Sequence, residues 1–177
     1  MDKFINKHIS IVNKNNTIIL KIGSIDHNQF NIRLTDHHVK QFMTNLYDKY
    51  PHIKKYKVSR DKKLYRYKNS ITEINRKGSE YYSYELKDTQ IVKSNNISIK
   101  LILLQKNDQD KCLSSIYKYH VIEHIEEYII DVNNMFSIII SNIEYDNDRW
   151  FTITIEIKKP NIPTKICNKI SQILELI

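Results

Sequence analysis

The sequence predicts a mainly β protein: an antiparallel barrel of about eight strands, closed or nearly closed, with one internal helix and a C-terminal helix. Short runs of alternating apolar and polar residues follow one another from Lys55 to Lys93, with polar turns between them, which is typical of a meander of hairpins. Two stronger strand patterns, Phe136–Ile143 and Trp150–Lys158, flank a turn at Asp146–Asp148. Strands joined by such short turns fit an antiparallel barrel or sandwich.

The first strand is expected over Asn16–Ile25, because Ile18, Leu20 and Ile22 fall on one face of it. After an extended Phe30–Leu34, Thr35 or Asp36 can cap a helix that ends at Pro51. The apolar residues of this helix recur at helical spacing and are Val39, Phe42, Met43, Leu46 and Tyr50.

The meander is expected to continue through several short strands with turns at Arg60–Lys63 and Arg76–Ser79. These strands are Tyr56–Ser59, Leu64–Lys68, Ile71–Ile74, Glu80–Leu86, Thr89–Lys93, Ile97–Leu104 and Ser115–Ile122. His124–Val132 suits a helix by spacing and a strand by its β-branched residues, and we favour the strand. The final helix follows Pro160 and Pro163, with apolar positions at Ile166, Ile170, Ile173, Leu174 and Ile177.

The last strand predicts which side of the sheet is polar. Thr152, Thr154, Glu156 and Lys158 share one face, and Phe151 and the isoleucines 153, 155 and 157 share the other. This pattern indicates a barrel with a polar interior and an apolar outer face that helices cover.

Composition indicates one folded domain, residues 1–177, with a positive field. The chain has 41% hydrophobic and 10% aromatic residues, which excludes an intrinsically disordered protein. It has no alanine, only 2 Gly and 3 Pro, and much Ile, Lys, Asn and Tyr, which we interpret as the codon bias of an AT-rich genome. The net charge of +8 favours a polyanionic partner such as RNA, or reflects only a lysine-rich solvated surface.

The cysteines and the N-terminus indicate an intracellular protein. Cys112 and Cys167 lie far apart, so we expect buried or idle thiols instead of a disulfide or metal pair. Met1–Ser10 lacks the apolar core of a signal peptide, and no apolar stretch reaches membrane-spanning length. We therefore expect a cytoplasmic location, or a nuclear or virion interior one, without secretion or contact with a membrane.

Most motifs that announce a reaction are absent or poorly placed. The two glycines, Gly23 and Gly78, cannot form a glycine-rich phosphate loop. The adjacent His37 and His38 would point apart on a helix, which disfavours a shared metal. His120, Glu123 and His124 spell an inverted zinc peptidase motif, but the surrounding pattern is that of a strand.

Cationic and aromatic residues alternate between Lys54 and Arg76, including Tyr56, Tyr65 and Tyr67. Such a pattern on a barrel rim can stack bases and neutralise phosphates. Tyrosine is equally a good strand former and lysine a good solubiliser, so both interpretations stand.

The order of elements resembles that of the triphosphate tunnel metalloenzymes, specifically the RNA 5′-triphosphatases of the mRNA-capping apparatus in fungi and large DNA viruses. The segments that carry the resemblance are Thr17–Gly23, the helix from Thr35, Ile97–Leu104, Ile138–Ile143 and Thr152–Glu156. The resemblance spans nearly the whole chain as a pattern. It implies a tunnel-shaped barrel and a role in mRNA capping or transcription.

The resemblance also shows where this chain departs from the family. Its enzymes bind a divalent metal through glutamates on the first and last strands. Here the matching positions are Thr17, Ile19, Thr152, Thr154 and Glu156, so one carboxylate of five remains. We therefore expect no metal cofactor, with Mg²⁺ or Mn²⁺ through Glu156 as the alternative. The side chains predicted to bind phosphate or RNA are Lys21, Lys100, Lys118, His120, Lys158, Arg60 and Arg66.

Three functions follow as hypotheses. The first is a non-catalytic barrel subunit, a pseudoenzyme that binds RNA or a larger subunit of the capping or transcription machinery. The second is an active, divergent polynucleotide 5′-triphosphatase that combines Glu156 with acids such as Glu73, Glu80 or Glu85. The third is a basic viral or structural protein that neutralises packaged nucleic acid.

Overall fold

The computed structural model describes the chain except residues 68–69, 78–79, 95–96, 108–118, 133 and 159–162. The side chains of 59–83, 94, 107, 119–124 and 163 also lie outside the description. The strands are β1 (Asn16–Asp26), β2 (Gln29–Asn31), β3 (Lys55–Tyr67), β4 (Ser70–Lys77), β5 (Glu80–Ser94), β6 (Ile97–Asn107), β7 (Tyr119–Val132), β8 (Phe136–Tyr145) and β9 (Asp148–Ile157).

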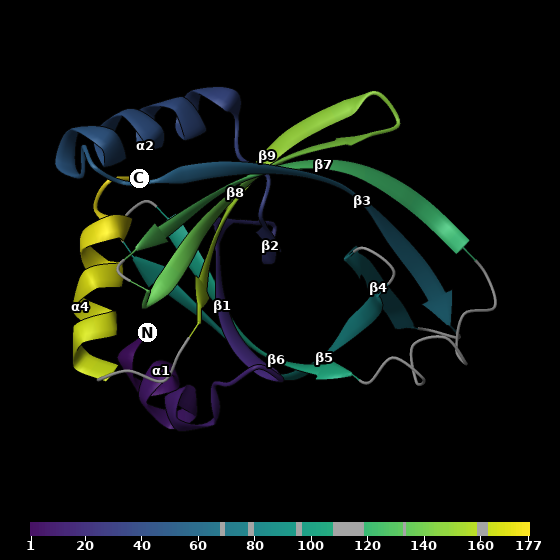
Figure 1. Cartoon of the computed structure of the whole chain (residues 1–177), viewed down its shortest axis with the longest axis horizontal. Helices are drawn as coiled ribbons and strands as arrows, with labels where there is room; N and C mark the ends of the chain where they lie inside the picture. The colour runs from purple at the N-terminus through teal and green to yellow at the C-terminus, as the bar shows by residue number, and fades with distance from the viewer. Residues whose placement is uncertain (68–69, 78–79, 95–96, 108–118, 133, 159–162) are drawn as a thin grey trace.

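The strands form one antiparallel sheet that curves into a ring (Figure 1). Their order is β2-β1-β6-β5-β4-β3-β7-β8-β9, and β1 pairs with β9 as well as with β6. The cycle of neighbours therefore contains eight strands, and the short β2 pairs only with the end of β1. The predicted antiparallel fold of about eight strands is confirmed.

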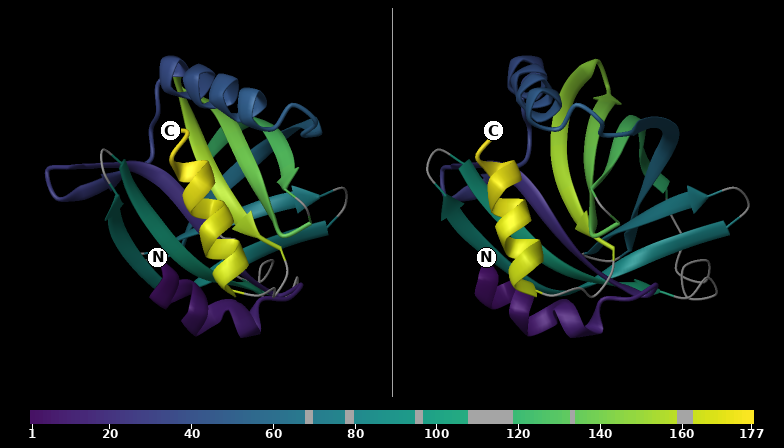
Figure 2. Two further views of the ribbon diagram at one scale, coloured as in Figure 1. Left: turned by 90° about the vertical axis from the view of Figure 1, so that its left-hand side faces the viewer. Right: turned by 60° about the vertical axis from the view of Figure 1, so that its left-hand side comes forward.

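Within the described residues, three helices cover the outer face of the ring. They are α1 (Asp2–His8), continued by a 3-10 turn Ile9–Ile11, α2 (Asp36–Lys49) and α4 (Pro163–Leu174). Figure 2 shows α4 against the outer side of the sheet, with α1 beside its lower end and α2 near its upper end. The internal and C-terminal helices are confirmed, whereas α1 was not predicted, because its seven residues are too few to show a helical period.

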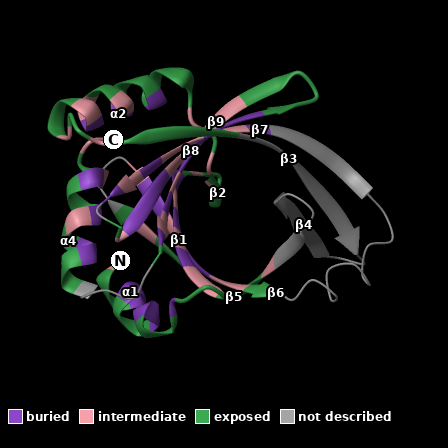
Figure 3. Cartoon of the chain, in the orientation of Figure 1, coloured by how far each residue is buried: buried purple, intermediate pink, exposed green. Residues whose placement is uncertain are grey.

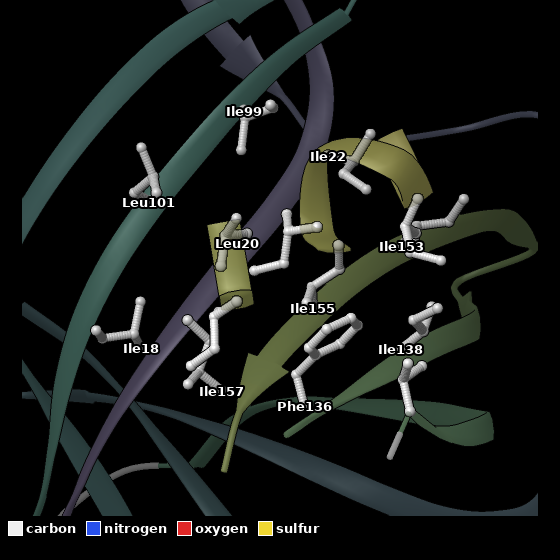
Figure 4. Close-up of a cluster of buried hydrophobic side chains, with 14 of the residues drawn as sticks. Ile18, Leu20, Ile22, Ile99, Leu101, Phe136, Ile138, Ile153, Ile155 and Ile157 are labelled. Atoms are coloured by element: carbon white, nitrogen blue, oxygen red, sulfur yellow. The ribbon is translucent and has the colours of Figure 1, made fainter. Parts of the chain in front are cut away.

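The hydrophobic core lies between this outer face and the helices. Alternate residues of β1, β8 and β9 point into it, among them Leu20, Phe136 and Ile155 (Figure 4). The helices contribute their inward-facing residues and expose the rest, as the colours of Figure 3 show. The fully buried helix residues are Ile5, Phe42, Leu46, Ile166, Ile170 and Ile173. The predicted apolar outer face is thus confirmed on these strands, and the register places the predicted Thr152, Thr154 and Glu156 of β9 on the inner face.

Tight turns of left-handed residues set the register of two hairpins. His27 and Asn28 join β1 to β2 with φ of 46° and 62°, and Asp146 and Asn147 join β8 to β9 with φ of 46° and 69°. Two successive positive φ angles are those of a type I′ turn, which matches the twist of paired strands and favours Asn and Asp.

Gly23 allows β2 to cross close to β1. A Cβ atom at this position would lie 2.0 Å from the carbonyl oxygen of Asn31, a contact that no side chain can make. Beyond Asn31 the chain reaches β9, where Leu34 and Phe151 exchange two backbone hydrogen bonds of 2.8 and 3.2 Å. The pairing of β1 with β9 ends at Ile22, and Leu34 pairs with β9 directly beyond that point.

Two of the predicted interruptions are wrong. The expected turn at Arg60–Lys63 is part of the continuous strand β3, because β7 offers a backbone partner to every residue from Lys55 to Lys63. The expected gap between Leu86 and Thr89 is a bulge within β5, where the register to β6 shifts between Leu86 and Asp88. Both segments are polar, which suggested turns, but neither contains the Gly, Pro or Asn that typically forms one.

The remaining strands follow the predictions, with different ends. Residues 124–132 are confirmed as strand within β7. The expected strand Ser115–Ile122 enters β7 at Tyr119, and its earlier part lies outside the described residues, as do Gly78 and Ser79 of the second expected turn. No helix of the described chain is long and apolar enough to cross a membrane.

Phe136→Ala tests the position of the core. Phe136 is fully buried, so its truncation leaves a cavity and should reduce the free energy of unfolding by about 3–5 kcal/mol. Ile11→Ala is the control, because Ile11 is 44% exposed and should change stability by about 0.5 kcal/mol or less. Urea denaturation measures both, and an equal effect of the two changes would contradict this core.

Candidate phosphate-binding site

Two lysines face each other at the centre of the inner face. Lys21 of β1 is the direct cross-strand partner of Lys100 on β6, and Thr154 of β9 is its partner on the other side. Both lysines are half-buried. Two ammonium groups on directly opposite positions of a sheet concentrate positive charge at one place, and this charge attracts an anion. The pair therefore has the charge and position to bind a phosphate group.

Glu156 lies one step along the same face, toward the end of β9. It stands opposite Ile19 of β1 and Ser137 of β8, and the Thr17 hydroxyl donates to its Oε1 over 3.4 Å. Burial raises the pKa of Glu156, against the charge of Lys158 and the Thr17 hydrogen bond, and the charges of Glu127 and Asp131 raise it further. This carboxyl group takes up a proton more readily than an exposed glutamate does.

Two more carboxylates share the inner face, and the sequence analysis missed both. Glu127 and Asp131 belong to β7 and lie opposite Ser141 and Ser137 of β8. The Ser141 hydroxyl donates to Glu127 over 3.3 Å, and Asp131 accepts from Ser137 and from Lys158, each over 2.5 Å. Burial alone would raise the pKa of Asp131, but the bonds from Lys158 and Ser137 lower it on balance.

The signal that could have found these two acids was the alternation of β7. On a strand, Glu127 and Asp131 fall on the same face as Ile125 and Ile129, whereas a helix would direct them differently. Because residues 124–132 also fit a helix, their faces could not be assigned from the sequence. Their hydroxyl and ammonium partners come from β8 and from the end of β9.

The side chains that the structure describes do not form a site for a divalent metal. Mg²⁺ and Mn²⁺ need several oxygen ligands that converge on one point. Within the described part of the chain, no group of three or more His, Cys, Asp or Glu side chains could hold a metal ion. Asp131 is instead bound to Lys158, and Glu127 to Ser141. The expectation of a metal-free domain stays a prediction for the whole chain.

The three additional acids of the enzyme hypothesis do not all face inward. Glu85 is opposite Gln105, itself opposite Asn16, on the outer face, and its carboxylate binds Lys87 over 2.8 Å. Its predicted approach to Glu156 is therefore wrong. Register places Glu73 of β4 and Glu80 of β5 on the inner face, and their side chains lie outside the described residues.

The other predicted phosphate ligands are spread around the ring. Arg60 and Arg66 belong to β3, where register places them on the inner face, away from the lysine pair. Lys158 follows β9 and binds Asp131. His120 sits in β7 at the irregularity between the pairs of Val121 and Tyr119, and Lys118 lies outside the described residues. The structure thus brings together Lys21 and Lys100 only, among the predicted ligands whose side chains are described.

The histidine motifs found in the sequence do not form a metal site in the described structure. His120, Glu123 and His124 lie on a strand, so they lack the helix that the zinc peptidase motif requires. Thr35 caps α2: its hydroxyl accepts from the backbone N–H of His38 over 3.4 Å, and the His38 ring lies 2.7 Å from the same hydroxyl.

The alternating lysines and tyrosines at the start of β3 divide between the two faces. Lys55 and Lys57 lie on the outer face against Tyr128, with the Lys55 ammonium 4.9 Å from that ring. The Lys57 ammonium also binds Glu126 over 2.7 Å. Tyr56 is on the inner face, opposite Ile129, so these residues do not form one continuous stacking surface.

Two solved structures of RNA triphosphatases are similar in fold to this chain. The RNA triphosphatase Pct1 of S. pombe, solved in complex with the Spt5 CTD, matches with a TM-score of 0.67 at 7% identity, covering 98% of this chain and 83% of that one. The RNA triphosphatase domain of the trifunctional mimivirus mRNA capping enzyme matches with a TM-score of 0.57 at 8% identity, covering 99% of this chain and 95% of that one. No protein-family model and no curated protein sequence matches the chain. The resemblance inferred from the sequence is confirmed at the level of the fold.

Glu156→Gln tests the buried carboxyl group through pH. Because the pKa of Glu156 is raised, its stabilising contribution is fully present below the ordinary value of 4.5 and is lost as the pH rises through the raised value. Glutamine cannot ionise, so the variant should match the wild type in acid and unfold at a higher temperature at neutral pH. Thermal unfolding across pH measures this. Glu175→Gln, at an exposed acid, should show no such trend, and a pH-independent effect of Glu156→Gln would contradict the assignment.

Proposed function

We propose that this chain is a single, non-catalytic RNA triphosphatase-like domain that binds the 5′ phosphates of RNA on its inner face. It would act as a subunit of the mRNA-capping or transcription machinery. One observation carries the proposal: Lys21 and Lys100 are opposed on the inner face of a fold shared with RNA triphosphatases.

The chemistry of the lysine pair suits a phosphate chain. Each ammonium group is a compact point charge with three donors, and phosphate oxygens are strong acceptors. Half-burial reduces the competition from water and so strengthens the attraction. Thr154, beside Lys21, adds a hydroxyl group at the same level of the ring.

The carboxylates support binding without hydrolysis. Thr17, Ile19, Thr152 and Thr154 occupy positions where the resemblance implies glutamates, and none of them can replace a carboxylate at a divalent cation. Of the acids on the inner face, Asp131 is neutralised by Lys158. The solved neighbours are RNA triphosphatases, but at 7% and 8% identity they support a common fold, not a common activity.

A second function, an active polynucleotide 5′-triphosphatase, rests on a separate observation. Glu127, Asp131 and Glu156 share the inner face, and register adds Glu73 and Glu80 to it. In that case substrate phosphates would complete the coordination of Mg²⁺ or Mn²⁺.

Lys21→Ala and Lys100→Ala test the binding site. Loss of a charge-assisted hydrogen bond should weaken the binding of tripolyphosphate and of 5′-triphosphate RNA about tenfold or more for each lysine. Calorimetric titration at fixed salt measures both ligands. The matched control is Lys14→Ala, which removes an exposed lysine before β1 and should have little effect.

Equal losses from all three lysine substitutions would contradict a specific site. Such a result would favour the third hypothesis, a basic structural protein in which the net charge of +8 attracts nucleic acid without a defined pocket. Binding to a large capping or transcription subunit, with no binding of RNA, would indicate a protein-binding scaffold instead.

Assay of phosphate release separates the non-catalytic domain from the enzyme. With Mg²⁺ or Mn²⁺ and 5′-triphosphate RNA, we expect no release above background, because the inner face lacks a converging set of carboxylates in its described part. Release that Glu156→Ala abolishes would contradict the non-catalytic function and establish the second candidate.

A further inference from the structure

Trp150, the one tryptophan of the chain, lies on the inner face at the end of a row of polar residues. Residues 152, 154 and 156 of β9 are Thr, Thr and Glu, and Trp150 stands on the same face at the hairpin end of the strand. It is half-buried and lies opposite Ile143 of β8. A large aromatic ring that remains partly open to solvent beside a polar surface is suited to contact a ligand.

Arg33 lies on this ring. Its guanidinium carbon is 4.3 Å from the centroid of the Trp150 ring, and its Nη1 is 3.7 Å from a carboxylate oxygen of Asp148. The Arg33 side chain is 55% exposed, so it keeps donors free to meet solvent or a ligand. Tyr145, opposite Asp148, adds a second aromatic ring that is 40% exposed. An indole and a guanidinium therefore stack near the turn of the β8–β9 hairpin, and the phenol ring lies on the same face of this hairpin.

This cluster is aligned with the lysine pair. Trp150 and Thr154 are four residues apart on one face of β9, which corresponds to about 13 Å along the strand. Thr154 is the cross-strand neighbour of Lys21, and Lys100 follows on the next strand. An extended nucleoside triphosphate has a comparable reach from its base to its terminal phosphate.

We infer that Trp150, with Arg33, is the binding site for the base of the first nucleotide of a 5′-phosphorylated RNA, whose phosphates extend toward Lys21 and Lys100. This inference rests on the proposed function and adds recognition of the first base: an aromatic ring and a cation bind the base, and two ammonium groups bind the phosphates. The contact between base and indole is sequence-tolerant, because every base has a flat π face. Arg33 would contact the first ribose phosphate or stack with the base.

The intrinsic fluorescence of Trp150 tests the inference without any substitution. Since the chain has no other tryptophan, a base stacked on Trp150 should quench the whole tryptophan signal. Titration of the wild type with 5′-triphosphate RNA should quench the fluorescence, and titration with tripolyphosphate, which lacks a base, should bind without quenching.

Variants measure the size of the contact. Trp150→Ala should weaken the binding of 5′-triphosphate RNA about 5- to 100-fold and leave the affinity for tripolyphosphate unchanged. Trp150→Phe should restore most of the RNA affinity, because it keeps an aromatic face. The matched control is Tyr47→Ala, which removes an aromatic ring that contacts Lys55 outside the inner face and should not alter RNA binding.

The outcomes separate this inference from the proposed function. RNA that binds without quenching, or Trp150→Ala that weakens RNA and tripolyphosphate equally, would overturn the base site and leave phosphate binding intact. Quenching by RNA without any binding of tripolyphosphate would support the base site and overturn the proposed phosphate site. If neither ligand binds the wild type, both fail.

Discussion

Burial of one face of β1, β8 and β9 against α2 and α4 is the constraint on which the rest of the structure depends. Ile18, Leu20 and Ile22 of β1 and Ile153, Ile155 and Ile157 of β9 are all fully buried in that layer. Because side chains alternate strictly along a strand, a shift of one residue would bring polar residues into the core. The same packing therefore directs Lys21, Thr154 and Glu156 inward.

The inner face that results is mixed in charge. Its aromatic, cationic and acidic side chains form three groups along the strands. At the hairpin end are Trp150 and Arg33, at the centre Lys21 and Lys100, and toward the other end Glu156 with Asp131 and Lys158. The acids near the last group have hydroxyl or ammonium partners, which is the arrangement of a structural network more than of a metal site. Lys21 and Lys100, at the centre, are the residues that we propose bind an anionic ligand.

Residues with a clear period or a strong local signal could be predicted from the sequence. The alternation in Asn16–Ile25, the Thr35 cap and the isoleucines of α4 each gave the correct element, and the last strand gave the correct faces. The continuity of β3 could not be predicted, because the polar run Arg60–Lys63 shows no apolar alternation and becomes a strand through its pairing with β7, a long-range contact. Glu127 and Asp131 were missed because their faces depend on strand pairing between β7 and β8, a long-range contact.

The bond between Leu34 and Phe151 has a consequence for solubility. Where β1 stops pairing with β9, the backbone groups of β9 would be left as an open template onto which a strand of another molecule could add. Leu34 occupies that place, and the close crossing at Gly23 lets the chain reach it. By occupying these backbone groups of β9, Leu34 disfavours the addition of a strand from another molecule at this edge.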